Sequence, residues 1–305
     1  MTGSFGPFRI GHHTHQGPRD TNQDTVLSIE LPDNRWLLAV ADGMGGLEAG
    51  EKASKTALGS LYSSLMDGAD LVEAVRTANA AVHQEAQGQV MGTTLVAAVL
   101  SGRRAEIVNV GDSRAYNSDV LGLIQLTQDH TMAEEAAREG ALGFEAMEDG
   151  ANRWAGALAR YLGASEEVEV DRFGPLDLLE GGWLVLCSDG VHGVMSVDEI
   201  NRFLLGQSDA EPAATGLVEE ALARKTGDNA SVALAFWPDP TAMPAAPSLK
   251  SPRRRETSIK PEKVLMRSPK TKPPLNKVAL TGMVFIIVVP LMIALDFFLD
   301  WILSR

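Results

Sequence analysis

Short apolar runs recur along the first 240 residues and predict β-strands. Each run is rich in Val, Leu, Ala or Ile and is bounded by Gly, Asp or Asn, which is typical of strands that end at turns. The runs with this pattern are RWLLAVADG (35–43), GTTLVAAVL (92–100), RAEIVNVGD (104–112), GWLVLCSDG (182–190) and NASVALAFW (229–237).

Apolar residues at helical spacing fill much of the sequence between these runs. The three- and four-residue intervals indicate helices with one buried face. The predicted helices are Gly50–Met66, Asp70–Ala86, Thr131–Gly140, Asn152–Gly163, Ser196–Gly206 and Ala210–Lys225.

Two of the strand runs, Thr93–Leu100 and Arg104–Val110, follow one another with no helix between them. So short a connection joins antiparallel strands, because parallel strands need a longer crossover. We therefore predict an α+β fold in which strands pack as sheets with helices outside, rather than a doubly wound parallel fold.

The C-terminal part has a different pattern. Residues Val278–Leu295 contain no charged side chain, and their number is close to the roughly 20 residues that span a bilayer core. We interpret residues 278–303 as a transmembrane helix; the alternative is a hydrophobic tail that binds a partner protein. Asp296 and Asp300 are expected at the far interface beside Trp301, with a polar contact inside the membrane as the alternative.

Charge divides the chain in the same way. Residues 250–277 hold ten Lys or Arg against two Glu, a net charge of +8, and residues 278–305 contribute −1. Since the whole chain carries −13, residues 1–249 carry −20. An acidic body disfavours nucleic acid as a partner, whereas a basic segment before an apolar one favours a membrane surface with a cytoplasmic flank. We divide the chain into a folded domain (1–240), a basic, proline-rich linker (241–277) and the membrane segment.

Five aspartates lie at the ends of strand runs: Asp24, Asp42, Asp112, Asp189 and Asp228. Each alone is compatible with a helix cap or a turn former. Gathered at one end of a sheet sandwich, they would repel one another unless a cation neutralised them. Oxygen donors together with a single cysteine point to Mg²⁺ or Mn²⁺ rather than zinc. A glycine after such an aspartate would let its carbonyl approach the ion and let the chain reverse with positive φ.

No covalent nucleophile is evident. Cys187 is not followed by the arginine of a cysteine-phosphatase loop, and the sequence contains no G-x-S-x-G elbow. A water molecule activated by metal is the simpler hypothesis for any hydrolytic chemistry.

The motifs, taken in order, resemble those of the metal-dependent serine/threonine protein phosphatases (the PPM family, type 2C). The resemblance spans about residues 11–237. It rests on RDTNQD (19–24), ADGMGG (41–46), GTTLVAAVL (92–100), VGDSRAY (110–116), LTQDHT (126–131), LCSDGV (186–191) and GDNASVAL (227–234). It implies an α-β-β-α sandwich of two antiparallel sheets flanked by helices, with a metal centre of two ions at one end.

The resemblance also implies roles for individual residues. Asp42 would bridge two metal ions and Gly43 would offer its carbonyl. Asp24, Asp189 and Asp228 would be direct or water-mediated ligands, and Asp112 with Asp189 would hold a third, weaker ion. Arg19 matches the arginine that binds the substrate phosphate, for which its forked guanidinium is suited, so Arg19 and Asp42 are the expected catalytic residues.

Some positions depart from the family pattern. Met44 stands where many eukaryotic members have a histidine proposed as general acid, and Gln23 replaces a glutamate. His130 fits the motif, but a structural hydrogen-bonding role is favoured over catalysis. His12, His13 and His15 resemble a metal cluster in sequence but are expected on the first strand. Residues 140–160 correspond to the variable flap near the family's active site, where substrate choice is expected to be decided.

These observations predict a phosphatase that hydrolyses phosphoserine and phosphothreonine in proteins at a binuclear Mn²⁺ or Mg²⁺ centre. We expect a single-pass protein of the cell membrane with its catalytic domain in the cytoplasm. Its expected partners are phosphoproteins, in particular membrane-associated Ser/Thr kinases and their substrates, and the lipid bilayer. The alternatives are a catalytically inactive scaffold that binds phosphoproteins, and an enzyme for small phosphorylated molecules.

Overall fold

The computed structural model describes residues 8–46, 48–138 and 156–238. The chain divides into two units, Met1–Ser248 and Leu249–Arg305, and all the described residues belong to the first. The linker (241–277) and the membrane segment (278–303) lie outside the described residues. No helix within the described ranges is both long and apolar enough to cross a membrane.

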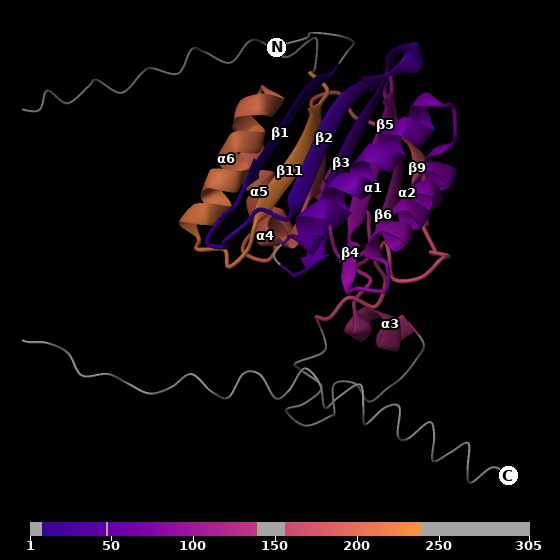
Figure 1. The fold of residues 1–305 in the computed structure, drawn as a ribbon. Helices are drawn as coiled ribbons and strands as arrows, with labels where there is room; N and C mark the ends of the chain where they lie inside the picture. The colour runs from indigo at the N-terminus through magenta and orange to yellow at the C-terminus, as the bar shows by residue number, and fades with distance from the viewer. Residues whose placement is uncertain (1–7, 47, 139–155, 239–305) are drawn as a thin grey trace, which may run out of the picture. The chain divides into compact units, whose positions relative to one another are not determined.

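Two antiparallel sheets form the centre of the first unit (Figure 1). One sheet has the order β1-β11-β10-β7-β8 and the other the order β2-β3-β5-β6-β9, with β4 paired to the end of β3. The strands are β1 (Arg9–His15), β2 (Asp24–Leu31), β3 (Arg35–Gly45), β4 (Met91–Thr93), β5 (Leu95–Ser101), β6 (Arg104–Val110), β7 (Arg114–Asp119), β8 (Gly122–Gln125), β9 (Asp171–Asp177), β10 (Trp183–Cys187) and β11 (Ala230–Phe236).

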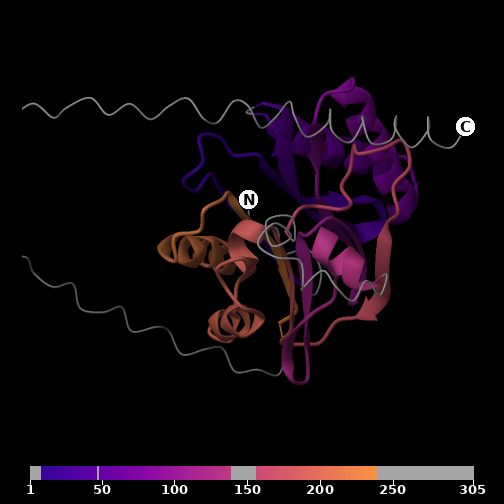
Figure 2. The same ribbon diagram turned by 90° about the horizontal axis from the view of Figure 1, so that it is seen from below.

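Helices cover the outer faces of both sheets. Helices α1 and α2 pack on the sheet that contains β3, and α4, α5 and α6 pack on the sheet that contains β11. Figure 2 shows the two groups of helices on opposite sides of the molecule. The helices are α1 (Ala49–Met66), α2 (Leu71–Ala86), α3 (Met132–Arg138), α4 (Asp189–His192), α5 (Val197–Leu204) and α6 (Ala210–Ala223), with a short 3₁₀ turn at Pro32–Asn34. The predicted α+β sandwich, with helices outside two antiparallel sheets, is confirmed.

Burial on both faces explains why the central strands read as continuous apolar runs. In β3, Leu37 and Ala39 face the helices, while Leu38 and Val40 face the other sheet. In β11, Val232 and Leu234 pack under α6, while Ala233 and Ala235 fill the space between the sheets. A strand with no solvent-facing side needs no polar alternation, and each large apolar side chain buried in this way stabilises the fold by about 1.5–3 kcal/mol.

Most of the predicted elements are confirmed to within a few residues. The β5–β6 hairpin pairs in antiparallel register from Leu95 opposite Val110. Helix α2 begins where Asp70 caps it, since the Asp70 carboxylate accepts a hydrogen bond from the Glu73 amide at 2.9 Å. The predicted run 92–100 is divided in the structure between β4 and β5, and no apolar run predicted β7, β8 or β9.

Two local predictions are wrong. The predicted helix Asn152–Gly163 is not formed over its described part, 156–163. There the backbone pairs with distant segments instead: Leu162 exchanges hydrogen bonds with Thr93, and Leu158 forms a bridge with Thr131. The predicted strand end at Gly43 is also wrong, because β3 continues to Gly45, where it pairs with Met91 of β4.

Candidate active site

The antiparallel topology brings the five aspartates to one end of the sandwich. Asp24 opens β2 and lies directly opposite Asp42 of β3 in the strand register. Asp112 follows β6, whose last residues pair with the start of β5 at the same end of that sheet. In the other sheet, Asp189 follows β10 and Asp228 precedes β11, and these strand ends are adjacent.

Hydrogen bonds tie the two sheets together at this end. The Ser188 hydroxyl donates to Asp24 Oδ2 at 2.9 Å and accepts a hydrogen bond from the Ser231 amide. The side-chain oxygen of Asn229, Oδ1, accepts a hydrogen bond from the Gln23 backbone amide at 2.8 Å. Because Ser188 and Asn229 belong to one sheet and Asp24 to the other, these contacts fix the width of the space between the sheet ends.

The threonines of the GTT motif hold the Asp42 backbone. The Asp42 amide donates to Thr94 Oγ1 at 3.0 Å, and the Asp42 carbonyl accepts hydrogen bonds from Thr93 Oγ1 and the Thr94 amide. Thr94 Oγ1 also lies 2.7 Å from Ser113 Oγ, beside Asp112. One short strand segment therefore fixes the position of two of the aspartates.

Gly43 is required by a close approach of backbones and not by an unusual φ. A Cβ at this position would lie 2.0 Å from the Gly50 carbonyl oxygen and 2.7 Å from that of Gln23. The expected chain reversal at positive φ occurs instead at Gly45, whose φ is 140°. Any side chain at Gly43 would push α1 away from the strand that carries Asp42.

Burial and mutual repulsion perturb the acids. Burial, opposed by hydrogen bonds from Ser231 and Ser188, raises the pKa of Asp24 to about 6. Burial and the Asp189 charge raise the pKa of Asp112 to about 7. Burial, followed by the charges of the other four aspartates, raises the pKa of Asp42 well above its ordinary value. Perturbed acids of this kind mark a functional site.

The donor set fits divalent cations that prefer oxygen. Asp24 Oδ1 and Asp189 Oδ1 are buried and have no hydrogen-bond partner in the structure, so each can bind a cation. In the part of the chain that the structure describes, no three His, Cys, Asp or Glu side chains form a closed cluster around one point. The carboxylates are within electrostatic range of one another, and their assignment as metal ligands stays a prediction.

Arg19 lies at the edge of this group. Its Nε donates to the Gly227 carbonyl at 3.0 Å, and its Nη2 forms a short hydrogen bond with Asp228 Oδ2. The side chain is 54% exposed, so its remaining N–H groups are accessible from solvent. This position is compatible with the predicted role in phosphate binding.

His130 contacts the backbone beside Asp112, as expected for a structural residue. It is fully buried, its Nδ1 accepts a hydrogen bond from the Gly111 amide at 3.0 Å, and its own amide donates to the Gly111 carbonyl. Burial lowers the pKa of His130, which favours the neutral ring. Because Nδ1 accepts the Gly111 hydrogen bond, the ring proton lies on Nε2, 3.2 Å from Asp171 Oδ2.

Other residues that shape the site had no clear sequence signal. The His192 ring contacts the Asp112 carbonyl at 3.0 Å, and burial lowers the pKa of His192 to about 4. Arg114 forms a two-bond pair with Asp129, within the GDSR and TQDH motifs. His12, His13 and His15 lie on β1, as expected.

Arg160 connects the described base of the flap to this site. It donates to Asp171 Oδ1 and to Glu135 of α3, both at 2.8 Å, and its side chain is 13% exposed. Asp171 in turn lies against His130. Through these contacts α3 and residues 156–160 are coupled to the Gly111–Asp112 turn.

Arg160→Met is therefore expected to lower the free energy of unfolding by about 3 kcal/mol, because it leaves two carboxylates of a partly buried network without their partner. Arg138→Met is the matched control, since Arg138 contacts the same Glu135 at 3.5 Å but is 39% exposed. Its effect should stay below about 0.5 kcal/mol. Urea unfolding measures both values. Equal effects would show that the contacts of Arg160 contribute no more to stability than the exposed contact of Arg138.

The comparisons with known proteins agree with the geometry. The sequence profile described as Protein phosphatase 2C matches residues 12–224. The serine/threonine phosphatase stp of Listeria monocytogenes is 32% identical over 241 residues, which cover 74% of this chain and 91% of that protein.

Solved structures give the same result. The serine/threonine phosphatase of S. agalactiae has a TM-score of 0.67 at 28% identity, over 75% of this chain and 99% of that one. The catalytic domain of PstP, solved in complex with two manganese ions, has a TM-score of 0.61 at 30% identity, over 76% of this chain and 99% of that one. From the matched profile, these relatives and the shared sandwich, we conclude that the chain belongs to the protein phosphatase 2C family of serine/threonine phosphatases.

Proposed function

We propose that this chain hydrolyses phosphoserine and phosphothreonine in proteins at a centre of two Mn²⁺ or Mg²⁺ ions, with a third, weaker ion beside them, at the cytoplasmic face of a membrane. The observation that carries the catalytic part is the convergence of five aspartates at one end of the sandwich, with two buried carboxylate oxygens that have no partner. The manganese ions in the related PstP domain support this choice of cofactor.

The aspartates and the residues that hold them have separate proposed roles. Asp24, Asp42, Asp189 and Asp228, with the Gly43 carbonyl, would hold two ions, and Asp112 with Asp189 would hold a third. When bound, such ions neutralise the acids and make water a stronger nucleophile toward phosphorus. The Ser188 and Thr94 hydrogen bonds hold Asp24 and Asp42 in place, so the carboxylates need little rearrangement during the reaction.

Arg19 would bind the phosphate at the edge of the site. The Arg19 guanidinium has further N–H groups beyond those that bond to Gly227 and Asp228. Its planar, paired N–H groups match the paired oxygens of a phosphate monoester. The leaving serine or threonine oxygen needs a proton. Met44 cannot supply one, so this step needs water or another group.

Phosphate release from a phosphothreonine peptide tests the proposal. The full-length protein should release phosphate when Mn²⁺ is added and should stop when a chelator removes it. Equal background rates under both conditions would favour the inactive scaffold instead. Faster turnover of a phosphorylated sugar than of the peptide would favour a small-molecule substrate.

Arg19→Lys is expected to raise the KM for the phosphopeptide about tenfold with a smaller change in kcat, because lysine keeps the charge but loses the paired hydrogen bonds. Steady-state kinetics at saturating Mn²⁺ measure this. Arg76→Lys on the exposed face of α2 is the control. An unchanged KM would remove Arg19 from substrate binding.

The membrane part rests on the sequence. The charge-free run within residues 278–303 and the basic linker before it favour a single-pass anchor, and a tether raises the local concentration of membrane-bound substrates. Its expected targets are membrane-associated Ser/Thr kinases and their substrates.

Deletion of residues 278–305 should leave turnover of a soluble phosphopeptide unchanged and slow the dephosphorylation of a vesicle-anchored phosphoprotein. The same vesicles with a soluble form of that substrate are the control. If deletion leaves both rates unchanged, the anchor has no such role.

A further inference from the structure

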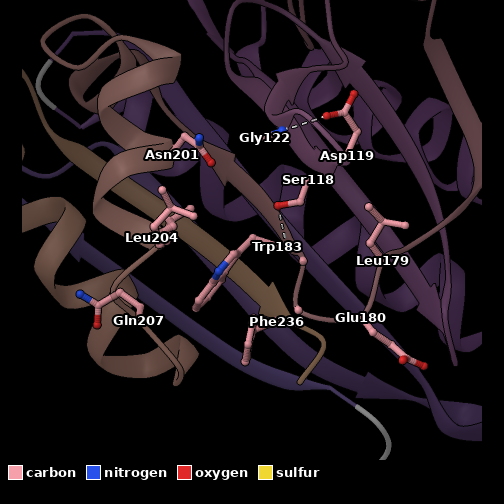
Figure 3. Close-up of a pocket in the computed structure, with 13 residues that line it drawn as sticks. Ser118, Asp119, Gly122, Leu179, Glu180, Trp183, Asn201, Leu204, Gln207 and Phe236 are labelled. Atoms are coloured by element: carbon pink, nitrogen blue, oxygen red, sulfur yellow. Dashed lines mark hydrogen bonds between the residues drawn. The ribbon is translucent and has the colours of Figure 1, made fainter. Parts of the chain in front are cut away.

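A cavity of about 230 Å³ lies at the end of the β11 sheet that faces away from the aspartates. The β7–β8 turn, the loop before β10, the end of α5 and Phe236 line it (Figure 3). The Trp183 and Phe236 rings stack in its wall, with centroids 4.5 Å apart. The Trp183 amide donates to Ser118 Oγ at 2.9 Å, which fixes the loop against β7.

Strand direction separates the cavity from the active site. β10 runs from Trp183 at the cavity to Cys187, two residues before Asp189, and β11 runs from Ala230, near Asp228, to Phe236. Five to seven residues of strand span about 17–23 Å. A molecule bound in this cavity would therefore not contact the catalytic aspartates.

Exposed apolar side chains gather around the cavity. Val120 and Leu121 in the β7–β8 turn are 89% and 90% exposed, and Leu205 at the end of α5 is 77% exposed. Leu179, before β10, is 37% exposed and lines the cavity itself. Clustered exposed apolar residues of this kind mark binding surfaces, because leaving them in water is costly.

The C-terminal segment leaves the described body beside this cavity. The Trp237 amide donates to the Gly182 carbonyl at 3.0 Å, and the Gly181 amide donates to the Trp237 carbonyl, so the chain is held against the lining loop up to its exit. Residues 239–249 follow, with the sequence DPTAMPAAPSL. Met243 lies five residues after Pro238 and can reach about 16 Å when extended.

We propose that the cavity binds residues 239–248 of the same chain, with the Met243 side chain inserted beside Trp183 and Leu205. Proline-rich segments already favour an extended conformation and dock on aromatic-lined grooves with little loss of entropy. A segment tethered a few residues away has an effective concentration in the millimolar range, so even weak contacts keep it bound. Methionine is flexible enough to fill an irregular pocket.

Charge favours this occupant over an anionic membrane. The charged side chains that line the cavity, Asp119 and Glu180, are both acidic, so the lining does not attract anionic lipid headgroups. Docking would cover the apolar rim and would hold the start of the linker at the end of the domain opposite the aspartates.

Disulfide trapping in the full-length protein tests the proposal. The only native cysteine, Cys187, is fully buried, so it does not compete with the engineered cysteines for disulfide formation. The pair Met243→Cys with Leu205→Cys should form an intramolecular disulfide at least tenfold faster than the control pair Met243→Cys with Ser101→Cys. Ser101 is exposed and precedes Gly102, whose carbonyl accepts a hydrogen bond from Trp237 Nε1, so it lies near the chain exit without lining the cavity. Equal rates would overturn the proposal.

Hydrogen exchange gives a second readout. Met243→Asp should speed amide exchange at residues 119–122 and 205–207, and should leave exchange in α2 unchanged. Unchanged exchange at the cavity would overturn the proposal. Disulfides that form only between chains would indicate a second copy as the occupant. Cavity protection that appears only with vesicles of phosphatidylglycerol and phosphatidylcholine would indicate the membrane. Either outcome would overturn the proposal, and neither depends on phosphatase activity.

Discussion

Asp42→Asn is expected to lower kcat for a phosphothreonine peptide by about 10³-fold or more. Burial and the charges of all four other aspartates raise the pKa of Asp42, so its carboxylate interacts with each of them. Asparagine has nearly the same shape but cannot supply a negative ligand. Loss of an electrostatic contribution of several kcal/mol to the transition state corresponds to this factor.

The fold should tolerate this change. Burial and the other aspartates raise the pKa of Asp42 well above its ordinary value, which favours the neutral acid in the metal-free protein, and an amide resembles that form. The free energy of unfolding with chelator present should therefore not fall, and should rise near neutral pH as repulsion is relieved. Asp67→Asn, on the exposed end of α1, is the matched control for kcat. If Asp42→Asn keeps near-normal turnover, the site assignment is wrong.

Mn²⁺ should stabilise the protein more at pH 7 than at pH 5. The folded-state pKa values of Asp24 and Asp112 are about 6 and about 7, both above the ordinary value of 3.8. Between pH 4 and 7 the folded protein therefore holds protons that the unfolded chain has released, and without metal this part of the stability is lost as pH rises. At pH 5 a bound cation must displace the protons on Asp24 and Asp112. At pH 7 fewer protons are bound there, so cation binding costs less free energy.

The stabilisation by Mn²⁺, measured as the difference between urea unfolding with Mn²⁺ and with chelator, should grow by on the order of 1–3 kcal/mol from pH 5 to pH 7. His192, with its pKa lowered to about 4, and His130 shift stability in the opposite direction with pH. They do so with and without metal, so their contributions largely cancel in the difference. Asp42→Asn should reduce the increase, whereas Asp67→Asn should not. A stabilisation that is the same at both pH values would contradict the proposed ligand set.

Part of the fold follows from local sequence. The central strands are buried on both faces, so β3, β5, β10 and β11 appear as continuous apolar runs. Edge strand β9 has only part-buried or exposed residues and contains Pro175, so its sequence carries no comparable run. Helices such as α2 can be predicted from an apolar face and a capping aspartate.

Local patterns in the sequence, namely acids next to glycine and apolar strand runs, identify the five aspartates, the two-sheet class and the family. How the acids are held depends on contacts between residues far apart in the chain. The Ser188–Asp24 contact joins residues 164 apart and the Gln23–Asn229 contact residues 206 apart. The same holds for residues 156–163, where pairing with Thr93 and Thr131 overrides helical spacing. Local periodicity shows which face of a segment is buried, but not which distant segment covers that face. The raised pKa values and the cavity beside Trp183 both depend on such distant contacts, and they therefore arise only in the folded chain.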